Sequence, residues 1–261
     1  MIHRSFFSIF LLFVVSCAPG GPDRFEQLFE GKLEMIDLNH PVNAQSQFFS
    51  ASEESPFTVD TVIGYAQGYF ARTFCVPEHF STHIDAPNHF EPEQPAVDLI
   101  PLSHLFAPAV KIDVSEKTKN DVDYELTPDD IEQWESDHGR IPFGSIVLLR
   151  TGWDKYWNDA AKYRGVDAEG KFHFPGYSRE AAELLVNERK VKALGIDNLS
   201  IDRGPSTDFA SHHVLNVAGG YALENLAHLA DVPAIGSYTI VAPMKLEGGS
   251  GGPVRVLVVV P

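Results

Sequence analysis

HFSTHIDAPNH, residues 79–89, carries four side chains that can bind a metal or move a proton: His79, His83, Asp85 and His89. All four stand at odd-numbered positions, so an extended segment would place them on one face. A helix fits less well, because Asp85 would lie well round from the first two histidines and Pro87 would break it. Imidazole nitrogen and carboxylate oxygen are ligand types that suit zinc, manganese and non-haem iron. The stretch therefore predicts an extended segment that carries a metal site.

A second cluster of ligand-type side chains is expected downstream of this stretch. A His-x-x-x-His pair alone is more often surface histidine, and a catalytic metal usually takes three or more protein ligands from distant parts of a chain. Residues 197–224 supply Asp197, Asp202, Asp208, His212, His213 and Glu224. We expect a helix over residues 215–226 with Glu224 near its end, where burial would be costly unless the carboxylate were paired or bound to a cation. Asp197 and Asp202 are interpreted as structural or as groups that orient histidine ligands.

The composition limits the class of protein. The chain has 261 residues, of which 44% are hydrophobic, which is enough for one large domain with its own core. A formal net charge of −16 argues against nucleic acid as a partner. The two cysteines, Cys17 and Cys75, cannot make a disulfide framework or a cysteine-based zinc site.

The N-terminal segment has the features of an export signal. Residues 1–16, MIHRSFFSIFLLFVVS, place a basic start before an apolar run that is too short to span a bilayer. The run ends before Cys17 in a pattern that resembles a bacterial lipobox, so Cys17 would become the lipidated first residue, and residues 17–34 would form a tether. The alternative is an ordinary secretory signal with an incidental cysteine. We expect an exported lipoprotein on the periplasmic or extracytoplasmic face, held at the membrane only by its lipid anchor.

Residues 35–261 read as one α/β domain. Strands are predicted at residues 109–114, 145–150, 191–196 and 253–260, and helices at 128–137 and 179–190. Thr127 is a suitable N-cap with proline next to it, and Ser178 caps the second helix. Strands that alternate with helices indicate an α/β fold.

Residues 248–252, GGSGG, match the G-x-S-x-G pattern of a nucleophilic serine. That pattern requires a strand, a sharp turn and then a helix, whereas PVRVLVVV after it predicts a strand. No histidine follows Ser250 to act as its base. We therefore interpret the motif as a glycine-rich turn before the last strand.

Residues 79–89 resemble the His-x-Gly-Thr-His-x-Asp-x-Pro-x-His signature of the cyclase family, which includes kynurenine formamidases and isatin hydrolases. The resemblance covers roughly residues 35–261 and continues through residues 151–153, 175–178, 195–202, 212–226 and 251–255. It implies a single compact α/β domain with a mixed, barrel-like sheet flanked by helices. It also implies assembly into homodimers or homotetramers.

The same resemblance implies roles for individual residues. The implied metal ligands are His79, His83, Asp85, His212 and Glu224, which would hold one or two zinc or manganese ions. His89 would be the general acid and base. Ser81 stands where the signature has glycine, and its side chain would narrow the approach to the metal or add a hydroxyl there. Phe48 and Phe49, in a loop, are weaker candidates for a substrate pocket, with a place in the core ranked slightly higher.

The activity expected is hydrolysis of a C–N bond in an amide, a cyclic amide (lactam or isatin-like) or a formamide. A metal lowers the pKa of bound water and polarises the carbonyl, and His89 would return the proton to the leaving nitrogen. Two alternatives remain open: a metal-dependent lactonase or dehydratase that uses the same site, and an exported lipoprotein that binds a metal or ligand without turnover.

Overall fold

The computed structural model describes residues 24–52 and 54–261. Contacts divide the chain into two units at Leu33 and Glu34. Residues 24–33 contain one short helix, α1 (Arg24–Phe29), within the predicted tether, while the predicted signal sequence and Cys17 lie outside the described residues. In the described part of the chain, the helices are all too short or too polar to cross a membrane.

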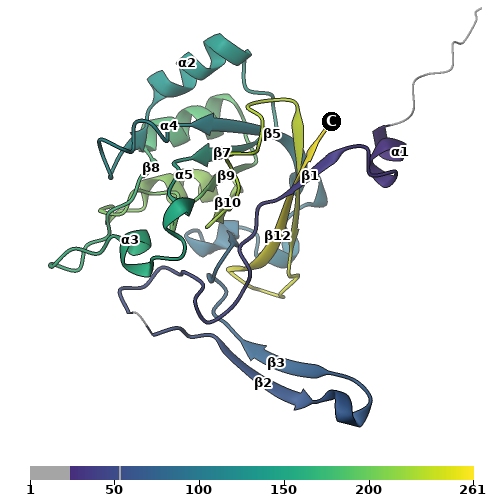
Figure 1. The fold of residues 1–261 in the computed structure, drawn as a ribbon. Helices are drawn as coiled ribbons and strands as arrows, with labels where there is room; N and C mark the ends of the chain where they lie inside the picture. Colours follow the sequence, from purple (N-terminus) through teal and green to yellow (C-terminus); the bar gives the residue numbers. More distant parts are fainter. Residues whose placement is uncertain (1–23, 53) are drawn as a thin grey trace, which may run out of the picture. The chain divides into compact units, whose positions relative to one another are not determined.

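The second unit is built on one sheet of eight strands (Figure 1). These are β1 (Glu34–Asp37), β4 (His83–Asp85), β5 (Phe106–Asp113), β7 (Ile146–Arg150), β9 (Ala193–Ile196), β10 (Tyr221–Glu224), β11 (Ser237–Pro243) and β12 (Gly251–Val260). Their order is β1-β12-β11-β5-β7-β9-β10-β4, and β4 pairs again with β12, which closes seven strands into a barrel. β5, β7, β9 and β10 run parallel and the other pairings are antiparallel. The predicted α/β fold with a mixed, barrel-like sheet is confirmed.

Side chains alternate between two cores along the parallel strands. On β7, Ile146 and Leu148 point into the barrel, while Val147 and Leu149 pack against the helices outside it. All four are fully buried. This explains why the sequence shows an unbroken apolar run here rather than an alternation of apolar and polar residues.

Helices cover one side of the barrel. They are α2 (Pro128–His138), α3 (Ala160–Arg164), α4 (Arg179–Glu183), which continues as the π-helical turn η6 (Leu184–Glu188), and α5 (Ala210–Val217). Thr127 caps α2 through a capping box with Asp130, and the side chain of Ser178 accepts from the amide of Ala181, as the sequence predicts. The predicted helix over residues 215–226 is wrong. Gly219 adopts a positive φ and ends α5, so Glu224 lies on strand β10.

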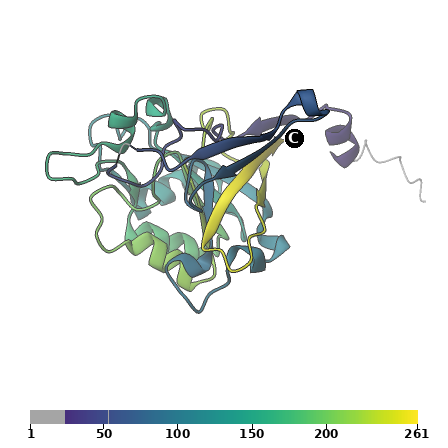
Figure 2. The same ribbon diagram turned by 90° about the horizontal axis from the view of Figure 1, so that it is seen from below.

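A hairpin of β2 (Thr58–Ile63) and β3 (Ala71–Cys75) extends away from the barrel (Figures 1 and 2). Its two strands are almost entirely exposed. The remaining pairing joins β6 (Glu125–Leu126) to β8 (Gly176–Tyr177). Short 3₁₀ turns complete the fold at η1 (Tyr65–Gln67), η2 (Pro87–His89), η3 (Val97–Leu99), η4 (Leu102–His104) and η5 (Asp154–Tyr156).

Candidate metal centre

The barrel brings the two ligand clusters together at one end. His83 and Asp85 lie on β4, and β10 pairs beside it with Glu224 directly opposite His83. His212 comes from α5, and His89 ends the turn η2. The extended segment is shorter than predicted, because only residues 83–85 form a strand and Pro87 begins a 3₁₀ turn.

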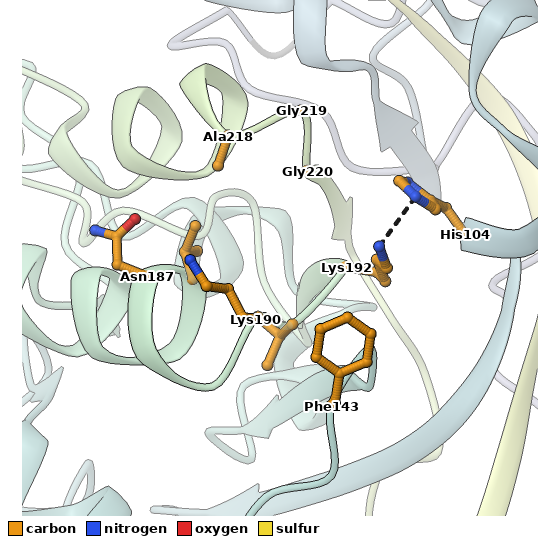
Figure 3. Close-up of a pocket in the computed structure, with 10 residues that line it drawn as sticks. His104, Phe143, Asn187, Lys190, Lys192, Ala218, Gly219 and Gly220 are labelled. Atoms are coloured by element: carbon orange, nitrogen blue, oxygen red, sulfur yellow. Dashed lines mark hydrogen bonds between the residues drawn. The ribbon is translucent and has the colours of Figure 1, made fainter.

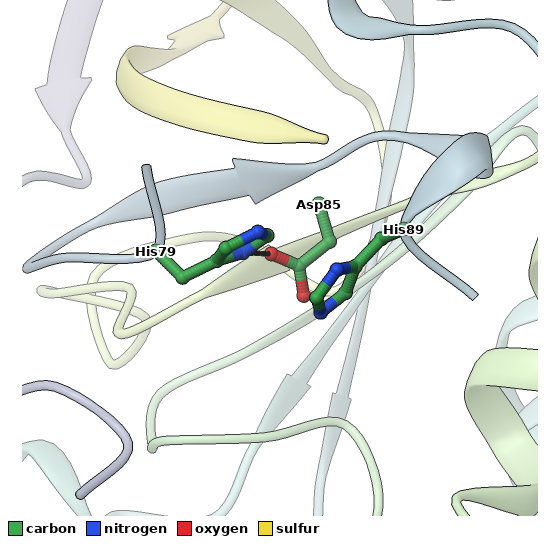
Figure 4. A group of neighbouring side chains, drawn as sticks. All are labelled: His79, Asp85 and His89. Atoms are coloured by element: carbon green, nitrogen blue, oxygen red, sulfur yellow. Dashed lines mark hydrogen bonds and ion pairs between the residues drawn. The ribbon is translucent and has the colours of Figure 1, made fainter. Parts of the chain in front are cut away.

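Asp85 is the centre of the cluster. Its Oδ1 lies 2.5 Å from His79 Nδ1 and 3.1 Å from His83 Nε2, and its Oδ2 lies 3.2 Å from His212 Nε2. Figure 4 shows the carboxylate of Asp85 between the rings of His79 and His89. Two triads that share Asp85 have ligand atoms within 4.8 Å of one another, His79–Asp85–His89 and His83–Asp85–Glu224. One carboxylate is therefore placed to serve two ligand sets.

Glu224 is buried and paired, as its predicted position in an apolar stretch requires. Its Oε1 accepts from the amide of Ile201 at 3.0 Å and lies 3.2 Å from His212 Nε2. Its Oε2 lies 3.6 Å from His83 Nε2. On the far side of His212, Nδ1 lies 2.6 Å from Asp202 Oδ2. Asp202 therefore orients a histidine, the role that the sequence suggested for it.

The hydrogen bonds of His83 and His212 to groups outside the cluster leave the lone pair of each ring facing the carboxylates. His83 Nδ1 donates to the carbonyl of Ser81 at 2.9 Å, and His212 Nδ1 donates to Asp202. Each ring is left with an acceptor Nε2 that faces Asp85 and Glu224, which are acceptors too. Acceptors that converge in a buried space need a cation or protons between them. The donor set fits a zinc or manganese ion.

The pKa values of the histidines and of Glu224 also indicate that the cluster needs positive charge. Burial alone would lower the pKa of His83, but the carboxylates of Asp85 and Glu224 raise it to about 9. Burial likewise opposes protonation of His212, yet its bonds to Asp202, Asp85 and Glu224 hold its pKa well above the usual range. Burial and the charge of Asp85 raise the pKa of Glu224. Without a metal, the cluster therefore retains protons where a divalent cation would supply charge.

His89 lies at the solvent side of the cluster. Its ring is exposed on one side and stacks on His79 with ring centroids 4.0 Å apart. The protein that surrounds the other side of the ring excludes water, and this desolvation lowers the pKa of His89 to about 4. The nearby histidines lower the pKa further. The imidazole is neutral at pH 7, which is the form that accepts a proton.

Ser81 is buried and supports the cluster through its backbone. Its carbonyl accepts from His83 and from the Asn225 side chain, and its φ of 59° explains why the signature has glycine at this position. Its Oγ is buried without a hydrogen-bond partner among the described residues.

A row of phenylalanines links the loop at residues 48–49 to the cluster. The ring centroids of Phe49 and Phe209 lie 6.3 Å apart, and those of Phe209 and Phe90 lie 5.4 Å apart. The ring of Phe90 stacks on that of His212 with centroids 4.5 Å apart. Phe49 is 43% exposed, whereas Phe48 is half-buried against Phe80. Sequence reasoning missed Phe90 and Phe209. The position of Phe90 directly after His89 was the signal available.

The other acidic and histidine candidates lie outside the cluster. Asp197 is fully buried and accepts from both backbone amides of Thr151 and Gly152 and from the Thr151 hydroxyl. Burial raises the pKa of Asp197 to about 7. His213 points away to Glu91 at 2.8 Å, and Asp208 is exposed near Arg179.

A separate pocket of about 210 Å³ lies where β9 and β10 begin, at the other end of these strands from the cluster (Figure 3). Lys192 Nζ lies 3.1 Å from His104 Nε2 there, and Lys190 follows the end of η6. The helices η6 and α5 both end at this pocket, and the lysine charges offset the negative ends of their dipoles. The fold thus accounts for the positive charge of the pocket.

The closed mixed barrel and its buried His–Asp–Glu cluster define a metal-dependent hydrolase. A family model described as "Putative cyclase" matches residues 36–203, and the chain belongs to this family. The resemblance inferred from residues 79–89 is confirmed.

Relatives and solved structures place the chain among hydrolases. An isatin hydrolase of Roseibium aggregatum is 36% identical over 192 residues, which cover 70% of this chain and 72% of that protein. A kynurenine formamidase of Salinibacter ruber is 30% identical, and the aligned part covers 69% of this chain and 74% of that protein. The structure of isatin hydrolase A from Ralstonia solanacearum superposes with a TM-score of 0.86 at 33% identity, covering 94% of this chain and 99% of that one.

Proposed function

We propose that this hydrolase cleaves the C–N bond of an amide, with a cyclic aromatic amide as the favoured substrate and a formamide as the second choice. The observation that carries the proposal is the convergence of two buried histidines, half-buried His79 and two buried carboxylates beneath a neutral, accessible His89. The names of the most similar relatives, isatin hydrolase and kynurenine formamidase, support the same bond type.

The residues that would hold the metal fall into two sets. By the family resemblance, His79, His83 and Asp85 would hold one zinc or manganese ion, and Asp85, His212 and Glu224 would hold a second where two are bound. The ion supplies Lewis acidity, which lowers the pKa of water and polarises a carbonyl. His89 would accept a proton from the attacking water and return it to the leaving nitrogen, because an amide anion is a very poor leaving group.

The phenylalanine row supports an aromatic substrate. Phe90 and Phe209 lie against His212, so a flat ring with its carbonyl at the cluster would contact them. Phe209 has a φ of 45°, a costly conformation for a bulky residue and one that often marks a functional site. Phe49 remains a proposed lining residue, whereas Ser81 is fully buried and Phe48 lines a different pocket beside Trp157.

The test is metal analysis followed by a substrate panel. The protein without residues 1–17 should contain about one or two equivalents of zinc or manganese by mass spectrometry, and His83→Ala should lose them. Aryl lactams, formanilides and matched lactones would then be compared. Faster turnover of lactones, or dehydration, would favour the alternative lactonase or dehydratase. Metal binding without any turnover would favour a binding lipoprotein.

We further propose that two copies associate through the β2–β3 hairpin. Its six exposed apolar side chains are Val59, Val62, Tyr65, Tyr69, Phe70 and Phe74. Residues 57–75 carry only two charges, of opposite sign, on a chain whose net charge is −16. An isolated two-stranded hairpin is marginally stable in water. These side chains expose roughly 600 Å², so two packed hairpins would bury about 1,200 Å², the lower limit of a standard interface.

Light scattering with size-exclusion chromatography tests this association. The wild type should elute as a dimer, or as a tetramer if a second surface contributes. The double variant Phe70→Ser/Phe74→Ser should be monomeric, and Phe143→Ser, at a comparably exposed phenylalanine on the barrel, should not change the mass. A monomeric wild type would contradict the proposal.

Export and lipid anchoring are proposed from residues 1–17 alone. The apolar run that ends at Cys17 supports them. Labelling with a fatty-acid analogue in a bacterial host should modify the full chain, and Cys17→Ala should remove the label. Labelling that persists in Cys17→Ala would contradict the anchor.

A further inference from the structure

The glycine-rich turn at residues 248–252 packs against His79. Gly251 pairs with Asp85 across the β12–β4 ladder, and a Cβ at Gly251 would lie 2.7 Å from His79 Cε1 and 2.4 Å from the Ile84 carbonyl. Any larger residue would therefore displace the imidazole. The turn therefore positions His79, a proposed metal ligand. This role is separate from the resemblance of residues 248–252 to a nucleophile motif.

Ser250 links His79 to a carboxylate outside the cluster. Ser250 Oγ lies 3.0 Å from His79 Nε2 and donates to Glu78 Oε2 at 2.5 Å. The backbone amide of Ser250 donates to the same oxygen at 3.0 Å. Glu78 is thus held from two directions by one residue of the turn.

The directions of these bonds fix the tautomer of His79. An ionised carboxylate only accepts, so the Ser250 hydroxyl proton points to Glu78 and its oxygen accepts from His79 Nε2–H. Nδ1, the atom 2.5 Å from Asp85 Oδ1, is then the nitrogen whose lone pair would face a bound metal; without a metal it would donate a proton to the carboxylate. With a metal bound, all three histidines would therefore present an acceptor nitrogen to the cluster, each backed by an outer acceptor.

We propose that Glu78 and Ser250 are positioning residues that fix the tautomer and orientation of His79 and thereby raise the affinity of the centre for its metal. This inference rests on the proposed metal site. An imidazole whose far N–H is bonded to an acceptor is a stronger and better-oriented ligand. Glu78 reaches His79 through the hydroxyl of Ser250, so the two residues act as one unit.

The geometry also argues against Ser250 as a nucleophile. Ser250, His79 and Asp85 have the connectivity of a Ser–His–Asp triad, but a triad needs a histidine lone pair on the nitrogen that faces the serine. Here that nitrogen carries the proton. The nucleophile interpretation makes a separate prediction, because a fluorophosphonate would label Ser250.

The experiment compares metal affinity in Ser250→Ala, Glu78→Gln and the double variant, using chelator competition on the metal-loaded protein. Each variant should bind zinc or manganese about 10–100-fold more weakly, and the double variant should lose no more than either alone, because both break the same chain of bonds. Ser103→Ala and Glu247→Gln, at exposed positions, are the matched controls and should bind normally.

A second readout separates the inference from the metal site itself. Proton–nitrogen NMR of the zinc-loaded protein should show His79 Nε2–H as a hydrogen-bonded proton, and Ser250→Ala should shift its resonance and speed its exchange with water. Unchanged affinity and an unchanged His79 Nε2–H resonance in both single variants would overturn the inference, as would labelling of Ser250 by a fluorophosphonate. A wild type that binds no metal would overturn the proposed function, whereas a wild type that binds metal normally together with two unaffected variants would overturn this inference alone.

Discussion

His83 and Glu224 are direct register partners on the antiparallel strands β4 and β10, with His83 Nε2 3.6 Å from Glu224 Oε2. The sheet itself therefore joins two clusters that are far apart in the chain. Because backbone pairing sets this relationship, the positions of His83 and Glu224 do not depend on a loop.

His89→Ala should lower the turnover number by about 10²–10⁴-fold while metal content stays normal. The reason is that His89 is neutral and accessible, with a pKa of about 4, whereas four of the five proposed ligands are buried. Amide turnover and metal analysis on the same preparation measure both effects. His83→Ala is the comparison and should lose metal and activity together. If His89→Ala also lost metal, His89 would be a ligand, which its position in a triad with His79 and Asp85 would allow.

The metal-free protein should become less stable as pH rises from 6.5 to 9. The pKa of His83 is raised from 6.5 to about 9, so the folded state binds more protons than the unfolded state in this window. The contribution of His83 protonation to the free energy of unfolding is complete below pH 6.5 and is lost as pH passes 9. Urea unfolding after chelation measures it, and His83→Gln should flatten the slope.

Metal affinity should change in the opposite direction over the same window. Binding displaces the protons that the histidines hold, so affinity rises with pH. Calorimetry in two buffers of different ionisation enthalpy should detect proton release at pH 7. Absence of proton release would mean that the histidines are already neutral in the metal-free protein.

Ser81→Gly should stabilise the fold by about 1 kcal/mol, because glycine removes the cost of a left-handed backbone and of an unpartnered hydroxyl. Lys190→Gly is the matched control, since Lys190 has nearly the same φ of 57° but is exposed. It reports the backbone effect alone. Thermal unfolding of both variants checks this, and a destabilised Ser81→Gly protein would show that the hydroxyl has a bonding partner in solution.

Phe209→Leu should reduce kcat/KM for an aromatic amide by roughly fivefold, the equivalent of about 1 kcal/mol of ring contact. An aliphatic amide should be affected much less. Phe172→Leu is the control, because Phe172 stacks on Phe49 at 4.6 Å without an aromatic contact to His212. Equal losses for both substrates would mean that Phe209 only supports the fold of the site.

Residue spacing was sufficient to find the first cluster, the four barrel strands β5, β7, β9 and β12, and the helices α2 and α4 with its continuation η6. The odd-numbered ligands of residues 79–89 carry a signal that is local in sequence. Thr127 and Ser178 mark helix starts through bonds to residues three positions ahead, which is again a local effect.

The features that sequence reasoning missed depend on contacts across the fold. Glu224 was assigned to a helix because residues 221–223 are apolar, and only pairing with β4 and β9 makes that stretch a strand. Phe209 approaches His212 only when α5 is in place. The contact of Ser250 with Glu78 spans 172 positions, and no pattern along the chain indicates such a contact.

The closure of the barrel by β12 has a consequence for how the enzyme is made. Every other barrel strand precedes β12 in the chain, yet β12 pairs with β1, β4 and β11 and follows the turn that seats His79. During synthesis, β4 therefore cannot pair with β12 until more than 160 further residues have been added to the chain. Until β12 has left the ribosome, a nascent chain has an open sheet edge and an unsupported His79. Such a chain would depend on chaperones for protection, and its metal centre could mature only after translation of the domain is complete.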